Sequence, residues 1–265
     1  MYTPQQRKAQ SGQAGTPRKP IYLATSQPLR VGLDGEALTL KNDTGTQRFP
    51  LARIARIVCN RHVDWSGQAL AACLTHSISI TWQDGHGAAL GGATPRLATP
   101  SALHPALELY LELADWPERY GNWLKRRRMA VLCAAARRAR EAGDPYSAER
   151  FSELKRDYVY RGRILPHFPD EGLGWCHAAA MQQLSTEQVL ARYWGYGGAP
   201  LELAEDLAGL VWAAVNFECG VLPEAGTARS RMMFFEAWLH EHSSLLLEHL
   251  AHLARHVARE NEAWR

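Results

Sequence analysis

The 265-residue sequence lacks a long apolar segment, a paired cysteine motif and a large excess of charge of either sign. Its longest uncharged apolar run, LAGLVWAAV at 207–215, is far shorter than the ~20 residues that cross a bilayer, so we expect no membrane partner. The five cysteines contain no CxxC pair, which argues against a zinc site or a disulfide framework and favours a reducing, cytoplasmic location. Because the net charge is only +3, a nucleic-acid site would need a local cluster of cations.

The sequence also lacks the motifs of several large enzyme classes. It contains no P-loop, no GxSxG nucleophile elbow and no HExxH zinc motif. GHGAALGG and WGYGGAP are rich in glycine, but their spacing departs from that of a dinucleotide-binding loop. The residues alone therefore indicate a domain organisation more clearly than a reaction.

Hydrophobic periodicity divides the chain into four parts. Residues 1–20 have no apolar signal-peptide core and are rich in Gln, Gly, Pro and basic residues, which predicts a disordered basic arm. Residues 21–92 have the pattern of strands, residues 93–105 form a proline-containing linker, and residues 106–265 have helical periodicity. Strands followed by helices predict an α+β multidomain protein, with an N-terminal β-rich domain and a C-terminal all-α domain.

The β-rich part contains two recognisable units. In PLRVGLDGEALTLK, two alternating stretches flank Asp34 and Gly35, which predicts a hairpin with a tight turn. In HVDWSGQALAACLTHSISITWQDGHG, residues 62–87, a short strand leads to a helix capped by Ser66, and a second strand over 78–82 follows. The pattern alone leaves open whether this β-α-β unit supplies chemistry or a scaffold.

A basic helix is predicted near the start of the helical part, where Pro117 suits the first turn of DWPERYGNWLKRRRMAVLCAAARRAR. Four arginines fall within a narrow arc of this helix, and apolar residues lie opposite them. They are Arg119, Arg126, Arg137 and Arg140. Such a row can neutralise successive DNA phosphates, but a solvated face, or one paired with nearby glutamates, has the same pattern. From this helix alone we favour the solvated face.

A candidate carboxylate lies in QLSTEQVLARYWGYGG. Ser185 and Gln188 have the spacing of a capping box, which predicts that a helix begins at Ser185 with Glu187 in its first turn. A structural role near the helix dipole explains Glu187 fully, and a metal ligand is the alternative.

The C-terminal segment WLHEHSSLLLEHLAHLARHVAR predicts one long amphipathic helix. His242, His249 and His256 share a line along it, beside a line that holds Glu241 and Glu248. A His with carboxylates could bind a divalent ion, although histidines along the border of a surface helix are commoner than metal sites.

The stretch FPLARIARIVCNRHVDWSGQALAACLTHSISITWQDGHG, preceded by IYLATSQPLRVGLDGEALTLK, resembles the N-terminal domain of the CRISPR-associated integrase family, the endonuclease of spacer acquisition. The order of its parts carries the resemblance: an apolar strand over 54–58, a step into a short helix at 63–66, the helix at 69–74 and a strand that closes on Gly87. The resemblance implies that the β-α-β unit is scaffold, in a domain through which the family forms its homodimer.

The helical half is similar to the same family in HPALELYLELADWPERYGNWLKRRRMAVL and STEQVLARYW. This similarity implies a Mg²⁺ or Mn²⁺ site with Glu187, His240 (or His242) and Glu248 as catalytic metal ligands. It also implies double-stranded DNA, spacer and repeat, as the partner, with a small companion subunit of the adaptation complex. The cations expected to grip its phosphates are Arg119, Arg126, Arg127, Arg137 and Arg140.

Three hypotheses follow. The first is a metal-dependent DNA endonuclease or integrase that inserts spacer DNA into a CRISPR array by 3′-hydroxyl attack on repeat DNA. The second is a catalytically degenerate family member that acts as a DNA-binding structural subunit. Its motivation is that Gln188 replaces the glycine that usually follows the family's catalytic Glu, and that only Leu239 and His240 remain of its His motif. The third is an unrelated helical interaction module joined to a β domain.

Overall fold

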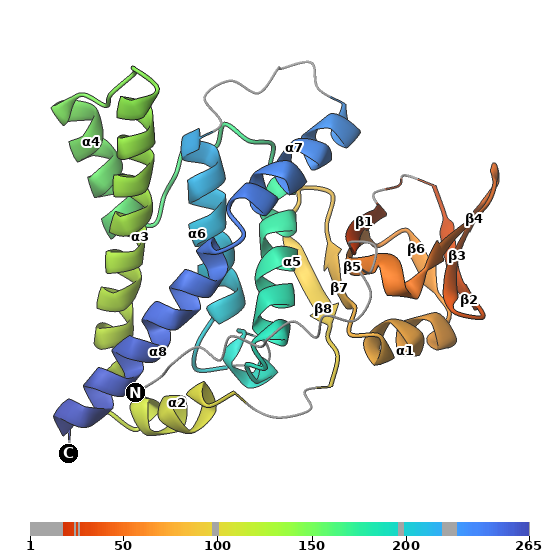
Figure 1. The fold of residues 1–265 in the computed structure, drawn as a ribbon, viewed down its shortest axis with the longest axis horizontal. Helices are drawn as coiled ribbons and strands as arrows, with labels where there is room; N and C mark the ends of the chain where they lie inside the picture. The colour runs from red at the N-terminus through yellow and green to blue at the C-terminus, as the bar shows by residue number, and fades with distance from the viewer. Residues whose placement is uncertain are drawn as a thin grey trace, which may run out of the picture.

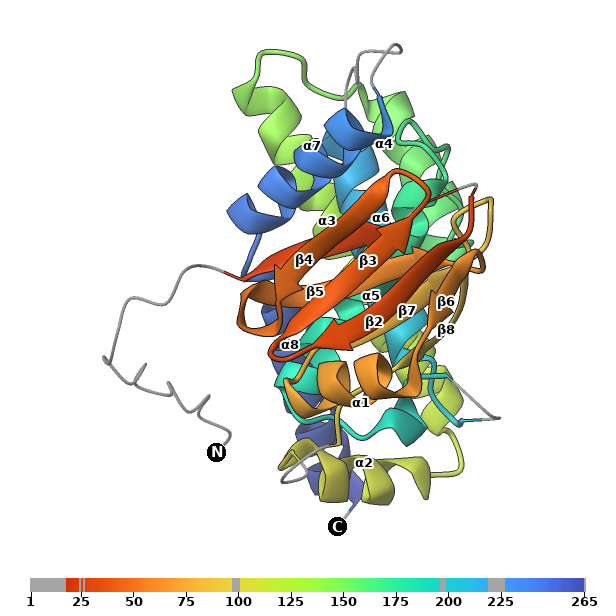
Figure 2. The same ribbon diagram turned by 90° about the vertical axis from the view of Figure 1, so that its right-hand side faces the viewer.

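The structure is a computed structural model, and it describes residues 18–23, 25, 27–96, 101–195, 199–218 and 227–264. Most of the predicted arm, residues 1–17, lies outside these ranges. Lys19 and Pro20, which we expected at the end of the arm, already belong to the first strand. Figures 1 and 2 show the arrangement of the strands and helices in two views.

The strands of the described residues form two four-stranded sheets. Sheet A has the order β1-β5-β7-β8, in which β7 and β8 are antiparallel and the other neighbours parallel, and sheet B has the order β4-β3-β2-β6. The strands are β1 (Lys19–Leu23), β2 (Leu29–Asp34), β3 (Ala37–Asn42), β4 (Gly45–Pro50), β5 (Ile54–Asn60), β6 (Val63–Trp65), β7 (Ser79–Gln83) and β8 (Ala89–Ala93). Sheet B faces the viewer in Figure 2, with sheet A between it and the helices.

Local sequence explains how the two sheets are joined. β2 and β3 form the predicted antiparallel hairpin, and Gly35 in its turn has a φ of +56°, which glycine adopts at little cost. In the predicted β-α-β unit, Ser66 Oγ accepts a hydrogen bond from the Ala69 amide at 3.1 Å and caps α1 (Gly67–Thr75). Because β6 lies in sheet B and β7 in sheet A, α1 ties the sheets together, and its Ala69 and Cys73 are fully buried.

The helices pack in layers on the free face of sheet A. Figure 1 shows α5 next to the sheet, α6 behind it, α3 farther out, and α8 crossing this stack toward the C-terminus. The helices are α2 (Leu103–Leu111), α3 (Trp116–Glu141), α4 (Ala148–Leu154), α5 (Glu171–Thr186), α6 (Leu203–Glu218), α7 (Ala228–Glu241) and α8 (Leu245–Trp264). The predicted fold class, a β-rich part followed by an all-α part, is therefore confirmed.

The two parts share a boundary of buried side chains. One apolar cluster lies between the sheets and α1, and the second fills the helical part and reaches sheet A at Val58. The Thr81 hydroxyl of β7 contacts the sulfur of Met181 in α5 at 3.4 Å. Sheet A is thus covered on both faces. Both ends of the stretch predicted as a linker, 93–105, lie in secondary structure, because β8 extends to Ala93 and α2 begins at Leu103.

The prediction that a helix begins at Ser185 is wrong. α5 ends there: Gln188 has a φ of +57°, its amide bonds to the Ser185 carbonyl at 3.1 Å, and the Val189 amide bonds to the Leu184 carbonyl at 2.9 Å. Two such hydrogen bonds around a residue in the left-handed conformation, here Gln188, are the geometry that closes a helix at its C-terminus. Glu187 is therefore a C-cap residue rather than a first-turn carboxylate.

The prediction of a single long C-terminal helix is also wrong. The segment forms two helices, α7 and α8, separated by residues 242–244. Because of this break, His242 does not continue the line of His249 and His256 on one helix. These two histidines are 1% and 4% exposed, so they are core residues of α8 rather than border residues of a surface helix.

Candidate nucleic-acid interface and predicted metal ligands

The three predicted metal ligands lie on different elements. Glu187 ends α5, where its carboxylate accepts a hydrogen bond from the Gln183 side-chain amide at 3.2 Å. His240 is exposed on α7. Glu248 is exposed in the first turn of α8, and it accepts a hydrogen bond from the Ser244 hydroxyl at 2.6 Å. Each side chain thus has a structural setting of its own.

Within the described ranges, no group of three or more His, Cys, Asp and Glu side chains is arranged to hold a metal ion. The structure therefore does not bring Glu187, His240 and Glu248 together as a ligand set. The alternative histidine, His242, already has partners: Nε2 lies 3.1 Å from Glu218 Oε2, and Nδ1 lies 2.8 Å from the Trp238 carbonyl. Since both ring nitrogens face acceptors, neither is available to a metal.

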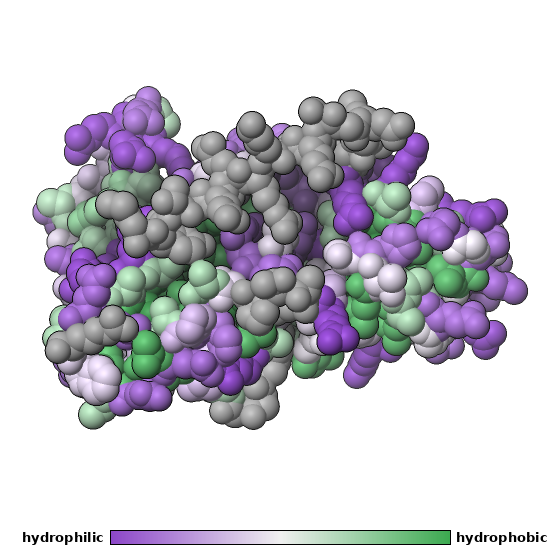
Figure 3. All heavy atoms as spheres, turned by 60° about the horizontal axis from the view of Figure 1, so that its bottom comes forward, coloured by the Kyte–Doolittle hydropathy of each residue, from purple (hydrophilic) through white to green (hydrophobic). Residues whose placement is uncertain are grey.

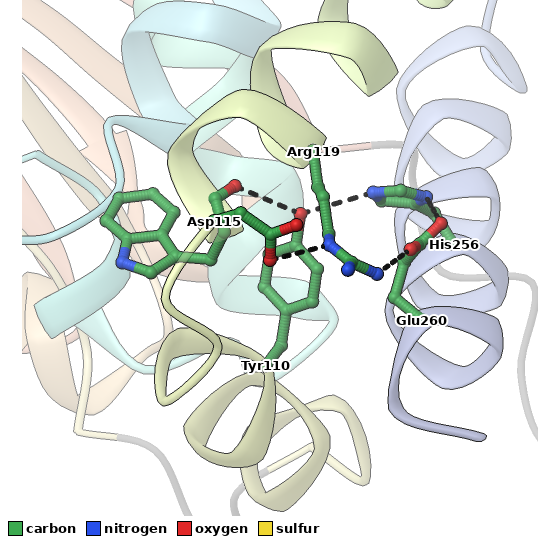
Figure 4. Close-up of polar contacts among 6 residues, drawn as sticks. Tyr110, Asp115, Arg119, His256 and Glu260 are labelled. Carbon is green, nitrogen blue, oxygen red and sulfur yellow. Dashed lines mark hydrogen bonds and ion pairs between the residues drawn. The ribbon is translucent and has the colours of Figure 1, made fainter. Parts of the chain in front are cut away.

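Arg119 lies between two carboxylates of the protein, as Figure 4 shows. Its guanidinium is 2.8 Å from Asp115 and 2.6 Å from Glu260 of α8. Glu260 also lies 3.4 Å from Nδ1 of His256, whose Nε2 is 3.2 Å from the Tyr110 hydroxyl. Arg119 therefore completes a network that connects α2, α3 and α8, and its charge is balanced inside the protein.

Arg127 points toward α8 as well. Its Nε–H donates a hydrogen bond to Nδ1 of the buried His249 at 3.1 Å. Burial, together with the charges of Arg127 and His252, lowers the pKa of His249 to about 3, so the ring is neutral and can accept this bond. Burial also lowers the pKa of Arg127. This pair joins α3 to α8, so that the Arg127 charge is only partly presented to solvent.

The other three cations of the predicted row remain exposed to solvent. They are Arg126, Arg137 and Arg140, and none of them forms an ion pair with a described residue. The neighbouring Arg138, which lies off the row, pairs instead with Glu218 of α6. The α3 arginines therefore divide into cations used for packing and cations left for a partner.

α8 contributes further basic side chains that were not among the predicted DNA contacts. His252, Arg255 and Arg259 are exposed, and their spacing of three and four residues places them on one side of the helix. Burial, and then Arg127 and Arg255, lower the pKa of His252. Arg127 of α3 and Arg255 of α8 are therefore close in space. The signal that could have found the basic side chains of α8 is the HxxRxxxR spacing in the C-terminal helix.

We call these exposed arginines of the two helices the α3–α8 basic face: Arg126, Arg255 and Arg259 where the helices pack together, and Arg137 and Arg140 about three to four turns farther along α3. Guanidinium groups that lack a protein carboxylate can bind phosphates without first breaking an internal ion pair. This face is the candidate nucleic-acid interface.

A buried cation joins the β-rich part to α7, and no local pattern had indicated it. Arg56 of β5 is 4% exposed and pairs with Glu236 of α7, which also accepts a hydrogen bond from the Tyr22 hydroxyl. Arg56 Nη1 donates to the Gln182 side-chain oxygen of α5 at 2.9 Å. A buried charge needs such partners, because desolvation without them is very costly. The cluster fixes α7 against sheet A.

On the face shown in Figure 3, hydrophobic and hydrophilic side chains of the described residues are interspersed, with no continuous apolar belt. Among those residues, no helix combines the length and the apolar character that a membrane span requires.

Known proteins resemble this chain at two levels. The family model described as CRISPR associated protein Cas1 matches residues 22–106. A Cas1 protein from Thermotoga maritima aligns with a TM-score of 0.64 and 13% identity over 91% of this chain and 97% of that protein. TtCas1 in complex with DNA aligns with a TM-score of 0.59 and 15% identity, over 90% of this chain and 91% of that one.

A casposase bound to its integration product aligns with a TM-score of 0.57 and 12% identity, over 91% of each chain. No curated protein matches the sequence significantly. At these identities the structural likeness shows the fold, and the family model adds a match in sequence over the β-rich part. The predicted resemblance to the CRISPR-associated integrase family is therefore confirmed.

Proposed function

We propose that this chain, which has the fold of Cas1 proteins, acts on double-stranded DNA in CRISPR adaptation as an integrase or nuclease. The observation that carries this proposal is the agreement of two independent comparisons: the family model over residues 22–106, and a shared fold over nine tenths of the chain. Two of the similar structures contain DNA or an integration product, which supports DNA as the substrate class.

The α3–α8 basic face is the proposed contact with the DNA backbone. Its arginines lie on two adjacent helices, so they can meet phosphates along one side of a duplex. Such contacts release bound counterions, and the resulting affinity falls steeply with salt. They position DNA without reading its sequence, so they fit spacer and repeat DNA equally well.

In the proposed reaction, the 3′-hydroxyl oxygen of the spacer bonds to a repeat phosphorus, and the bond from that phosphorus to the 3′ oxygen of the repeat strand breaks. The proton lost by the attacking hydroxyl balances the one gained by the leaving 3′ oxygen. Mg²⁺ or Mn²⁺ is the cofactor that the family resemblance implies, with Glu187, His240 and Glu248 as its ligands. The described residues do not fit that ion, because they contain no three-ligand group. The degenerate DNA-binding subunit therefore stays as the alternative.

Strand transfer tests the proposal. A labelled duplex with a free 3′-hydroxyl is incubated with supercoiled plasmid that carries a repeat, in Mg²⁺, Mn²⁺ or EDTA. The proteins are the wild type, Glu187→Ala, and Glu118→Ala as a control for loss of an exposed carboxylate on α3. Metal-dependent product that is lost only in Glu187→Ala supports an integrase with Glu187 in its site.

The other outcomes separate the remaining hypotheses. Absence of product in every metal, together with salt-sensitive duplex binding, supports the degenerate subunit. Absence of both product and salt-sensitive binding contradicts the proposal and favours the unrelated interaction module.

The proposal includes a homodimer formed through the β-rich domain and a small companion subunit, as the family resemblance implies. Sedimentation velocity of the full chain tests the first, and co-purification with the product of a neighbouring small gene tests the second. A monomer at all concentrations would contradict the dimer without affecting the DNA-binding face, because the two involve different parts of the chain.

A further inference from the structure

A groove of about 1090 Å³ runs between the β-rich part and α7. One wall is β1, the second is β4 with the turn that precedes it, and the third is the side of α7 that carries Met233 and His240. Figure 2 shows β4 as the strand of the front sheet nearest to α7. The groove shares no residue with the α3–α8 basic face.

Two walls of the groove are edge strands. β1 pairs only with β5 and β4 pairs only with β3 in the described part of the chain, so each has one edge with unpaired backbone groups. An exposed edge is a template that an added strand can extend through main-chain hydrogen bonds. At a rise of about 3.3 Å per residue, β1 is long enough to match about five residues of an extended peptide.

The lining is mainly apolar and adaptable. The lining includes Met232 and Met233 of α7 and Leu40 and Phe49 of the β-rich part. Met233 is 64% exposed, so its side chain is accessible to a partner in the groove. Flexible thioether side chains fit partners of different shape, so methionine is common at binding surfaces.

The lining of the groove carries an excess of positive charge. Lys19, Arg229 and His240 contribute the basic groups, and Glu236 is the single carboxylate among the lining residues. The Glu236 carboxylate is already bound to Arg56 and to the Tyr22 hydroxyl. An acidic group on an incoming segment would therefore meet cations and no free carboxylate of the groove.

We propose that this groove binds an extended peptide segment of a partner protein, with alternating apolar side chains and acidic residues at its ends. Charge argues against the chain's own residues 1–17 as occupant, because they contain two basic residues, Arg7 and Lys8, and no Asp or Glu. The apolar lining argues against nucleic acid, which would leave Phe49 and Met233 facing phosphates. The inference does not rest on DNA binding by the α3–α8 basic face, and of the three metal ligands that the family resemblance implies only His240 lines the groove.

A random dodecapeptide library displayed on phage tests the proposal on the full-length protein, with binding of the enriched peptides measured by fluorescence anisotropy. We expect enriched peptides with alternating apolar residues and a net negative charge. Met233→Lys and Arg229→Glu should each weaken their binding at least tenfold. Leu90→Lys, which changes a 61%-exposed leucine on the other edge strand of sheet A, is the matched control and should leave binding unchanged.

Four outcomes overturn the proposal. Two come from the library: no enrichment of peptides on the wild type over the Met233→Lys protein, or enrichment of basic peptides. The others are displacement of the bound peptide by a 20-nucleotide single strand, and a wild-type dimer that becomes monomeric in Met233→Lys. The third would assign the groove to nucleic acid, and the fourth to a second copy of this chain. Circular dichroism of each variant checks that its fold is retained.

Discussion

Two groups of arginines in this molecule carry the same charge in different surroundings. Arg56 and Arg119 lie among carboxylates of the protein, whereas Arg126 and Arg137 are exposed and have no such partner in the described residues. The first group connects elements: Arg56 joins β5 to α7, and Arg119 joins α3 to α8. The second group connects nothing within the chain. A basic side chain therefore indicates a nucleic-acid contact only after its internal partners are known.

The largest effect is expected at Arg56. Arg56→Ala leaves the Glu236 carboxylate and the Tyr22 hydroxyl without their shared partner, and such a change typically costs about 3–5 kcal/mol of the free energy of unfolding. Urea unfolding measures it. The control is Arg53→Ala, which changes an exposed arginine three positions earlier in the chain and should alter the free energy of unfolding by less than about 0.5 kcal/mol. An equal, small loss in both variants would remove the distinction between the two groups.

A half-buried carboxylate that forms no ion pair with a described arginine extends the comparison to the opposite charge. Asp206 accepts a hydrogen bond from the Tyr120 hydroxyl at 2.6 Å, and burial raises the pKa of Asp206 to about 6. Since the folded pKa exceeds the unfolded value, this group's contribution to stability is present below pH 4 and is lost as the pH rises through about 6.

Asp206→Asn keeps an acceptor for Tyr120 and removes the titration. The difference in the free energy of unfolding between wild type and variant should change by on the order of 2 kcal/mol between pH 4.5 and pH 7.5, in favour of the variant at the higher pH. Urea midpoints at the two pH values measure this change. A difference that does not depend on pH would show that Asp206 titrates normally.

Arg119→Ala should lower the free energy of unfolding by only a fraction of the loss expected for Arg56→Ala. The Arg119 side chain is partly exposed, and ion pairs in contact with solvent contribute little. Thermal unfolding measures the loss, and Glu260→Gln should produce a similar one because it breaks the same contact. Duplex DNA binding should be unaffected in both, whereas a large change in DNA affinity would move Arg119 into the exposed group.

The sequence predicted features whose determinants are local. The hairpin turn at Gly35, the helix cap at Ser66 and proline in the first turn of α3 each depend on neighbouring residues, and the structure confirms all three. The order of strands and helices followed from periodicity for the same reason.

The errors have physical causes that a local pattern does not contain. The letters Ser-Thr-Glu-Gln fit a helix start and a helix end equally well, and only the left-handed Gln188, at a position where glycine is usual, distinguishes them. Arg56 meets Glu236 across 180 positions of the chain, so no window of sequence shows the pair. The role of the α3 arginines was similarly ambiguous, because the carboxylates near Arg119 and Arg138 come partly from α6 and α8.

The salt dependence of duplex DNA binding tests the central claim, that the exposed arginines of the α3–α8 basic face contact DNA while the paired ones do not. Anisotropy of a labelled 25-base-pair duplex is measured across a range of NaCl for the wild type, for Arg119→Ala, and for the triple variant Arg126→Ala, Arg137→Ala and Arg255→Ala. The account predicts that the slope of log K against log salt falls by about 2–3 in the triple variant and stays unchanged in Arg119→Ala. Equal slopes in all three proteins, or a loss in Arg119→Ala as large as in the triple variant, would contradict it.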